Sequence, residues 1–299
     1  MTDDQAIPAL VTAEWLAARL GDPNIRPVDV RWYLAEPARG RAEYEAAHIP
    51  GAPHMHIDDE LSAPRGQGPG RHPLPAPENF AALAGRAGIG PDTHVIAYDS
   101  SGGAAAARLW WLLRYFGHTR VSLLDGGWPA WQAGGHPIEH EPPQIAPREF
   151  VAVPHSEMVV DAAAVDKLRR DPRALVLDAR ANERYEGQVE PIDPQAGHIP
   201  GARSAPYAGN LRPDGTLKSA EELRDRYLAF GADAADTIVC YCGSGVTAAH
   251  DVLALFLAGR TDALLYEGSW SDWSSDSTRP VATGAESGLE GGLGIPSIS

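Results

Sequence analysis

The stretch TIVCYCGSGVTAAHDVLALFLAG, residues 237–259, contains the pattern that decides the fold. Apolar and β-branched residues run up to Tyr241, which is typical of a buried strand. A short loop rich in glycine and serine follows, and an alanine- and leucine-rich segment then predicts a helix that ends before Gly259. A strand, a loop and a helix in this order form the repeating unit of an α/β domain with a mainly parallel sheet.

The neighbouring segments continue this alternation. RALVLDAR, 173–180, and DALLYEG, 262–268, are further apolar runs that predict strands. SAEELRDRYLAFG, 219–231, predicts a helix, because Ser219 is followed three residues later by Glu222 in the pattern of a capping box. Helices therefore flank the sheet of this α/β domain.

The chain repeats itself once. YDSSGGAAAARLWWLL, 98–113, aligns with YCGSGVTAAHDVLALF, 241–256, and LLDGGWPAW, 123–131, aligns with LYEGSWSDW, 265–273. This predicts one domain that has been duplicated. We expect a first domain at 1–138, a proline-rich linker at 139–158, a second domain at 159–277 and a flexible tail at 278–299.

Composition narrows the class of protein. The 299 residues carry a formal net charge of −15, which argues against nucleic acid and anionic membranes as partners. No stretch has the pattern of a signal peptide or the length of a membrane span. The two cysteines, Cys240 and Cys242, are too close along a strand to pair easily, so a reducing compartment and a cytoplasmic location are expected.

Cys242 stands where ligands bind in such sheets, beyond the carboxyl end of a strand. The loop after it can turn its main-chain N–H groups inward and, with the start of the helix, form an anion site that would hold an exposed thiolate. A buried structural cysteine is the alternative, and for Cys240 it is the expected one. Asp99 occupies the aligned position in the first half, so any thiol chemistry is confined to one site.

Other chemistries fit less well. A phosphatase loop of this type would place an arginine six residues after the cysteine, where this chain has Ala248. His54 and His56 could bind a metal, but no cysteine or acidic residue is spaced to complete the site.

Taken together, these motifs resemble the tandem-domain rhodanese-type sulfurtransferases over about residues 10–277, and CGSGVTA, 242–248, resembles the active loop of their 3-mercaptopyruvate branch. The resemblance implies an enzyme with two rhodanese-like domains. It would move sulfur from 3-mercaptopyruvate or thiosulfate through a Cys242 persulfide to a thiol, thioredoxin or cyanide, without a metal or organic cofactor. A thiosulfate-preferring enzyme and a persulfide carrier that does not turn over remain as alternatives.

The resemblance also assigns site residues. Arg184 would bind the anionic end of the donor, and the loop would contact the substrate through Gly243, Gly245, Val246 and Thr247. The mercaptopyruvate branch has a second arginine shortly downstream of the first, but this chain has none there. Arg203 or Arg212 could compensate.

A proton relay is the last implied feature. Ser244 in the loop would pair with His72 and Asp58 of the first domain, with Asp59 as an alternative to Asp58. Such a triad could move the thiol proton of the donor. It would also place the site between the two domains and explain why a first domain without a cysteine is retained.

Overall fold

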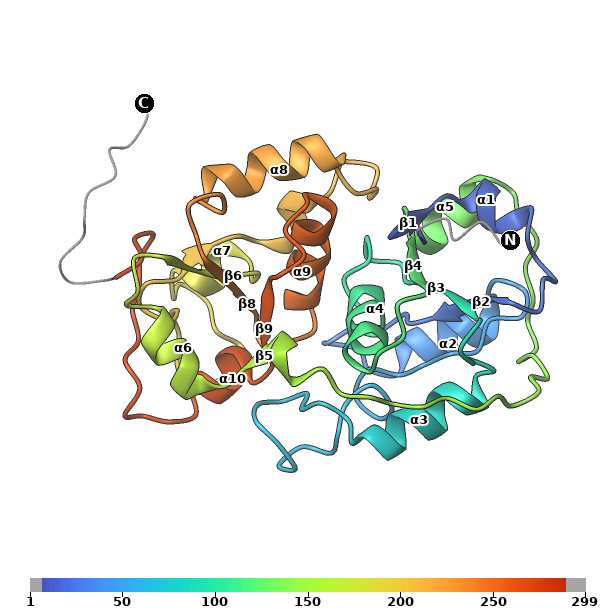
Figure 1. The fold of residues 1–299 in the computed structure, drawn as a ribbon, viewed down its shortest axis with the longest axis horizontal. Coiled ribbons are helices and arrows are strands. Elements are labelled where there is room, and N and C mark those ends of the chain that lie inside the picture. Colours follow the sequence, from blue (N-terminus) through green and yellow to red (C-terminus); the bar gives the residue numbers. More distant parts are fainter. Residues whose placement is uncertain (1–6, 289–299) are drawn as a thin grey trace.

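Each half of the chain folds around its own parallel sheet, in a computed structural model that describes residues 7–288 (Figure 1). The first sheet has the order β1 (Leu10–Val11), β4 (Val121–Leu124), β3 (His94–Tyr98) and β2 (Ile25–Asp29). The second has the order β5 (Val159–Val160), β9 (Leu264–Tyr266), β8 (Thr237–Tyr241), β6 (Ala174–Asp178) and β7 (Arg203–Ser204). All the pairings of these strands are parallel, which confirms the predicted fold class.

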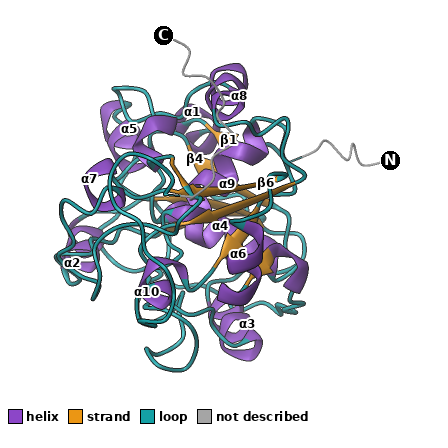
Figure 2. Cartoon of the chain, turned by 90° about the vertical axis from the view of Figure 1, so that its left-hand side faces the viewer, coloured by secondary structure: helices purple, strands orange, loops and turns teal. Residues whose placement is uncertain are grey.

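Helices surround the strands, as the view in Figure 2 shows. Those of the first domain are α1 (Ala13–Ala17), α2 (Arg39–Ala46), α3 (Pro77–Arg86), α4 (Ala106–Tyr115) and α5 (Gly127–Ala133). Those of the second are η1 (Ser156–Met158), α6 (Ala162–Leu168), α7 (Asn182–Tyr185), η2 (Tyr207–Asn210), α8 (Ala220–Ala229), α9 (Ala248–Leu257) and α10 (Ser269–Trp273). The capping box predicted for α8 is present, with Ser219 and Glu222 bonded reciprocally at 3.2 and 2.7 Å.

The sequence duplication reappears as duplicated contacts. In the first domain the Arg31 guanidinium is 2.6 Å from the Asp29 carboxylate and 4.7 Å from the ring centre of Trp128. The second domain has the same two distances among Arg180, Asp178 and Trp270. In both domains the arginine and its aspartate are buried. Each charge is tolerated inside the protein because the other neutralises it.

The two domains share one hydrophobic core. Helices α4 and α9 pack against each other at the domain boundary, in the middle of Figure 1. Trp110 of α4 meets Phe256 of α9 edge to face at 5.5 Å, and Leu109 and Leu253 are fully buried in the same cluster. A boundary of this apolar kind fixes the position of one domain relative to the other, unlike a polar hinge.

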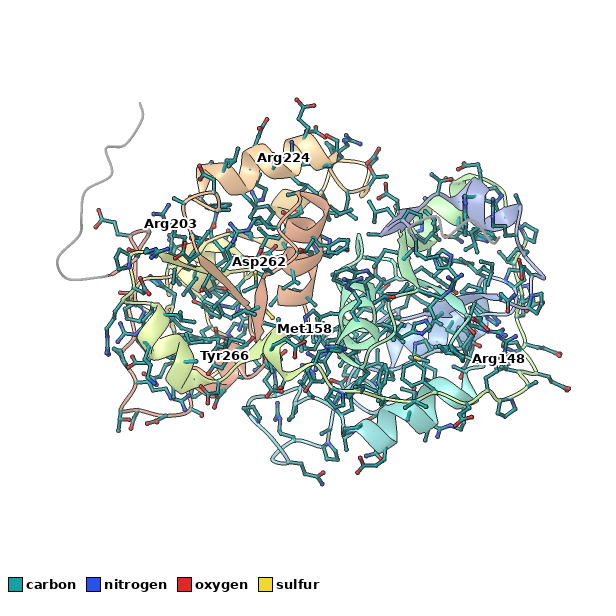
Figure 3. All side chains as sticks on the ribbon, viewed as in Figure 1. Arg148, Met158, Arg203, Arg224, Asp262 and Tyr266 are labelled. Carbon is teal, nitrogen blue, oxygen red and sulfur yellow. The ribbon has the colours of Figure 1, made fainter. Side chains whose placement is uncertain are left out.

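The predicted linker lies along the first domain. The Arg148 N–H donates to the Gly85 carbonyl at 3.0 Å, and the Val153 N–H donates to the Phe116 carbonyl at 3.1 Å. Figure 3 shows Arg148 on this first-domain side and Met158 near the start of the second domain. The linker is thus anchored over much of its length.

The start of the predicted tail is bonded to the second domain. Ala282 pairs with His198 in an isolated bridge, and the Trp273 indole donates to the Pro280 carbonyl at 2.8 Å. These contacts argue against a free segment at 280–287, while residues 289–299 lie outside the described residues. Within the described part, none of the helices has the length and apolar character needed to cross a bilayer.

The loop after β3 binds a carboxylate with its main chain. The two oxygens of Asp99 accept four hydrogen bonds of 2.7–2.9 Å, from the N–H groups of Ser101, Gly103, Ala105 and Ala106. This loop leads into α4, and the N–H groups of Ala105 and Ala106 are among those that a helix start leaves without partners. The strand–loop–helix unit of this fold is therefore an anion site even where no cysteine is present.

This arrangement predicts the effect of Asp99→Ala on stability. Loss of the carboxylate leaves several buried N–H groups without an acceptor, which should lower the free energy of unfolding by about 2–4 kcal/mol. Urea denaturation followed by circular dichroism would measure it. The exposed Asp92→Ala variant, which changes charge equally, should shift stability by less than about 0.5 kcal/mol. Equal effects of the two substitutions would contradict this account of the loop.

Candidate active site

Cys242 follows β8 directly and lies in the loop that leads into α9. Its sulfur accepts the Gly245 N–H at 3.1 Å and the Ser244 N–H at 3.5 Å. Gly245 has φ +81°, and a Cβ there would lie 2.7 Å from the Glu267 carbonyl, so the turn requires glycine. The aligned loops of the two domains thus surround different acceptors, a carboxylate in the first and a sulfur in the second.

The cysteine is less accessible than the sequence indicates. Cys242 is 2% exposed, so the expectation of an exposed sulfur is wrong. The reason is tertiary: Cys242 belongs to the buried cluster in which the two domains pack together. Cys240, in mid-strand, is fully buried as expected, and burial raises the pKa of its thiol.

The other predicted loop residues differ in position. Gly243 faces the guanidinium groups of Arg71 and Arg184. Gly245 donates to the sulfur. Val246 is buried in the shared core, and Thr247 is the residue before α9. Within the described part of the chain, neither of the last two donates its main-chain N–H to the sulfur, so their contact with a substrate stays a prediction.

The structure brings together the three residues of the predicted relay. The His72 ring is 2.6 Å from the Ser244 hydroxyl through Nδ1 and 2.7 Å from Asp58 Oδ1 through Nε2. His72 and Ser244 are 172 positions apart in the chain and belong to different domains. Asp59 takes no part, because its side chain is 81% exposed and faces His56 instead.

The surroundings fix the protonation of this relay. Burial lowers the pKa of His72, and the nearby Asp58 carboxylate only partly opposes this. Burial disfavours ionisation of Asp58, but hydrogen bonds from His72 and from the Trp32 indole, at 2.7 Å, outweigh it and lower the pKa of Asp58. At neutral pH the neutral ring therefore donates from Nε2 to the Asp58 carboxylate. Its Nδ1 is left free to accept the Ser244 proton.

Arg108 of α4 connects the relay to the cysteine loop. Its fully buried guanidinium donates to the Gly245 carbonyl at 3.2 Å and to the His72 carbonyl at 3.0 Å. Burial lowers the pKa of Arg108 to about 10, so it stays charged at neutral pH and places a cation beside the loop. The sequence analysis missed this residue; a single arginine in the otherwise apolar segment AAAARLWWLL, 104–113, was the available signal.

A cluster of charged side chains borders the loop. Arg184 is 2.7 Å from Glu190 and 3.2 Å from Asp193, and Asp193 also pairs with Arg71. Arg71 lies next to His72 in the first domain and was not predicted to act at the site.

The two arginines suggested as compensating residues bond elsewhere. Arg203 donates to the Phe230 carbonyl at 3.0 Å, and Arg212 pairs with Glu222 on the exposed side of α8. Among residues 7–288, neither forms a hydrogen bond or an ion pair with the cysteine loop.

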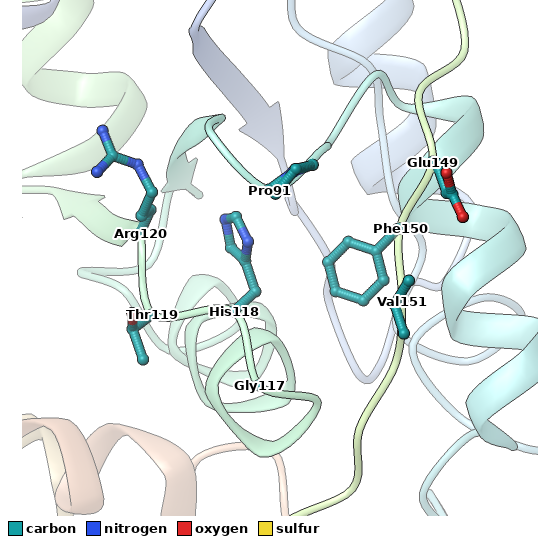
Figure 4. A pocket seen from close by; sticks show the side chains of 8 residues that line it. All are labelled: Pro91, Gly117, His118, Thr119, Arg120, Glu149, Phe150 and Val151. Atoms are coloured by element: carbon teal, nitrogen blue, oxygen red, sulfur yellow. The ribbon is translucent and has the colours of Figure 1, made fainter.

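A separate pocket of about 420 Å³ opens between the first domain and the linker (Figure 4). It is lined by Pro91, Gly117, His118, Thr119, Arg120, Glu149, Phe150 and Val151. None of these is a predicted site residue, so Cys242 and the predicted relay are not part of this pocket.

Known proteins resemble this chain in sequence. The model of the rhodanese-like domain matches twice, at residues 12–134 and 161–276. A probable 3-mercaptopyruvate sulfurtransferase from Pseudomonas aeruginosa is 45% identical over 92% of this chain and 98% of its own length. A putative thiosulfate sulfurtransferase, SseB, from Mycobacterium tuberculosis is 42% identical over 92% of this chain and 97% of its own.

A solved structure resembles this chain in fold as well. The 3-mercaptopyruvate sulfurtransferase SseA from Escherichia coli superimposes with a TM-score of 0.79 and 36% identity, covering 88% of this chain and 98% of SseA. Since the rhodanese-like model matches both halves and these relatives span nearly the whole chain, the protein belongs to the rhodanese family.

Proposed function

We propose that this protein is a sulfurtransferase that carries sulfur as a persulfide on Cys242. The observation that carries the proposal is the sulfur of Cys242, which accepts two main-chain N–H groups directly beside the Ser244–His72–Asp58 chain. Fixed N–H donors stabilise an anionic sulfur in both the thiolate and the persulfide states. The names of the relatives support 3-mercaptopyruvate and thiosulfate as donors.

The proposed first step breaks a carbon–sulfur bond. The Cys242 thiolate attacks the sulfur of 3-mercaptopyruvate, and an S–S bond forms while the electron pair of the C–S bond moves to carbon. The thiol proton of the donor passes to Ser244 as the Ser244 proton moves to His72 Nδ1. The relay then returns a proton to the carbon of the pyruvate enolate, so that pyruvate leaves.

The second step restores the enzyme. An acceptor thiolate or cyanide attacks the outer sulfur of the persulfide, and the electron pair of the S–S bond returns to Cys242. Both cysteines are free, which supports work in a reducing compartment such as the cytoplasm. Small thiols, thioredoxin and cyanide are the acceptors we propose.

Cys242→Ser should abolish turnover and the gain of one sulfur atom in the protein mass after incubation with donor. The hydroxyl is a far weaker nucleophile and cannot hold a sulfane sulfur. Cys240→Ala, two positions away, should keep both properties. Pyruvate release and intact-protein mass spectrometry would measure the two effects, and a Cys242→Ser protein that still gains sulfur would contradict the proposal.

Turnover also separates an enzyme from a carrier. With excess 3-mercaptopyruvate and a thiol acceptor, we expect many pyruvate molecules for each protein chain. A single stoichiometric burst would instead identify a persulfide carrier.

Ser244→Ala and His72→Ala should each lower kcat for 3-mercaptopyruvate by about 10²–10⁴-fold, the usual contribution of a positioned acid–base group. Thiosulfate brings no thiol proton, and its leaving group, sulfite, needs no proton to depart. Its turnover should therefore fall much less. Steady-state kinetics with the two donors would measure the difference, and equal losses with both donors would show that the two residues do not act as a proton relay.

The buried state of His72 predicts a pH profile. The ring accepts a proton only when neutral, and its lowered pKa keeps it neutral to below its ordinary value of about 6.5. The ratio of kcat/KM for 3-mercaptopyruvate to that for thiosulfate should therefore be constant near neutral pH and fall as the pH drops through this lowered pKa. A ratio that falls already above pH 7 would contradict the assignment.

A further inference from the structure

We propose that a pocket between the two domains, beside the C-terminal ends of α4 and α9, binds a small apolar carboxylate whose oxygens pair with Arg114. The pocket is separate from the candidate active site, because Cys242 precedes α9 whereas the pocket reaches Phe256 near its end. Between Ala248 and Phe256 the helix rises by about 12 Å. The inference concerns a second ligand and does not depend on sulfur transfer.

Both domains line this pocket, which has a volume of about 360 Å³. The first domain contributes Trp110 and Arg114 of α4, and the second contributes Phe256 of α9 and residues among 260–264. Met158, at the end of the linker, lines it as well. The volume lies at the lower end of the range of about 300–1,000 Å³ that is usual for small-molecule sites. Since Trp110, Phe256 and Met158 are apolar, the pocket suits a ligand with an apolar body.

Arg114 brings into this pocket a charge that no neighbouring group neutralises. The side chain is half-buried, and in the described part of the chain its guanidinium forms neither a hydrogen bond nor an ion pair. Burial lowers the pKa of Arg114, and no carboxylate is close enough to oppose this effect. An arginine remains ionised at neutral pH, and a cation taken from water without a partner is costly. An anion that enters the pocket would remove this cost.

The other charged side chains of the pocket already have partners. Arg260 lies 2.9 Å from Asp262, so these two charges neutralise each other. Glu157 lies 2.7 Å from His155, and its side chain is 71% exposed, so water screens its charge. The charge left without a partner is therefore the positive one of Arg114, which favours an anion as the ligand.

Two aromatic rings hold the guanidinium of Arg114 in place. Its central carbon lies 5.1 Å from the ring centre of Trp110 and 4.6 Å from that of Phe256. A cation–π contact provides no oxygen acceptor, so the N–H groups of the guanidinium remain available for a carboxylate. Because Trp110 and Phe256 belong to different domains, a ligand bound at Arg114 would lie at their boundary.

The indole of Trp110 is a second donor without a partner. Trp110 is 1% exposed, and its Nε1 has no hydrogen-bond acceptor among residues 7–288. A buried N–H group without an acceptor destabilises a protein, and a carboxylate has acceptor sites for more than one donor. Two unpaired donors at one pocket therefore favour a carboxylate over a single-atom anion such as chloride.

Isothermal titration calorimetry with 3-phenylpropionate and the neutral 3-phenylpropanamide would test the inference. We expect the parent protein to bind the acid at least about 10-fold more tightly than the amide. Arg114→Met keeps an apolar stem but removes the cation, so it should weaken binding of the acid by about 10–100-fold. Arg114→Lys should fall between the parent and Arg114→Met, because it keeps the charge and loses the fork.

Arg86→Met is the matched control. Arg86 is an exposed arginine in the last turn of α3, as Arg114 is in the last turn of α4, and its substitution changes the net charge equally. This variant should bind 3-phenylpropionate as the parent does. Equal affinity of the parent for acid and amide, no binding of either, or an equal loss in Arg86→Met would overturn the inference.

Thermal melting separates binding from folding. A ligand that binds the folded protein raises its melting temperature. 3-Phenylpropionate should therefore raise the melting temperature of the parent and, by less, that of Arg114→Lys, and should leave that of Arg114→Met unchanged. A rise in Arg114→Met as large as that of the parent would show that the acid binds elsewhere and would overturn the inference.

Arg184→Ala excludes the cysteine loop as the binding site of the probe, because Arg184 is an arginine beside that loop. The variant should bind 3-phenylpropionate as tightly as the parent. A loss as large as that in Arg114→Met would place the acid beside Cys242 and contradict the proposed pocket. None of these measurements requires turnover, so a failure of the proposed sulfur transfer would leave their outcome unaffected.

Discussion

The apolar contact between α4 and α9 is the constraint on which the rest of the structure depends. It fixes two duplicated domains into one body, and Arg108, buried within that contact, bonds at once to the cysteine loop and to the loop of His72. Without the contact between α4 and α9, the His72 imidazole would not lie 2.6 Å from the Ser244 hydroxyl. A buried cation is costly to leave without hydrogen-bond partners. The two carbonyls that accept hydrogen bonds from Arg108 therefore also fix the position of one domain relative to the other.

The duplicated domains contain two copies of one anion-binding loop, and the two copies donate hydrogen bonds to different groups. In the first domain the loop is filled permanently by Asp99, whose four hydrogen bonds contribute to stability. In the second, the loop surrounds Cys242, whose sulfur receives two hydrogen bonds. The first domain also places His72, Asp58 and the guanidinium of Arg71 around this second loop.

An acidic protein has to gather positive charge locally if it is to bind the anionic donors proposed here. Here Arg180 and Arg184 pair with the buried carboxylates of Glu190 and Asp193. Each charge that is removed from water therefore has a partner of opposite sign. Arg71 Nη2 and Arg184 Nη1 both lie near Gly243, the residue after Cys242. The packing of one domain on the other therefore sets the positions of both these arginines and Cys242.

The sequence by itself determined the elements and their duplication, because strand and helix patterns, the Ser219 cap and the Cys242 loop are local features. It also pointed, through a family resemblance, to His72, Asp58 and Ser244. Only the tertiary structure decided that Asp58 and not Asp59 faces His72, that Cys242 is covered, and that Arg108 and Arg71 reach the loop. The contacts of Arg71 and Arg108 join groups more than a hundred residues apart, and their geometry depends on how two apolar surfaces dock, which no local pattern encodes.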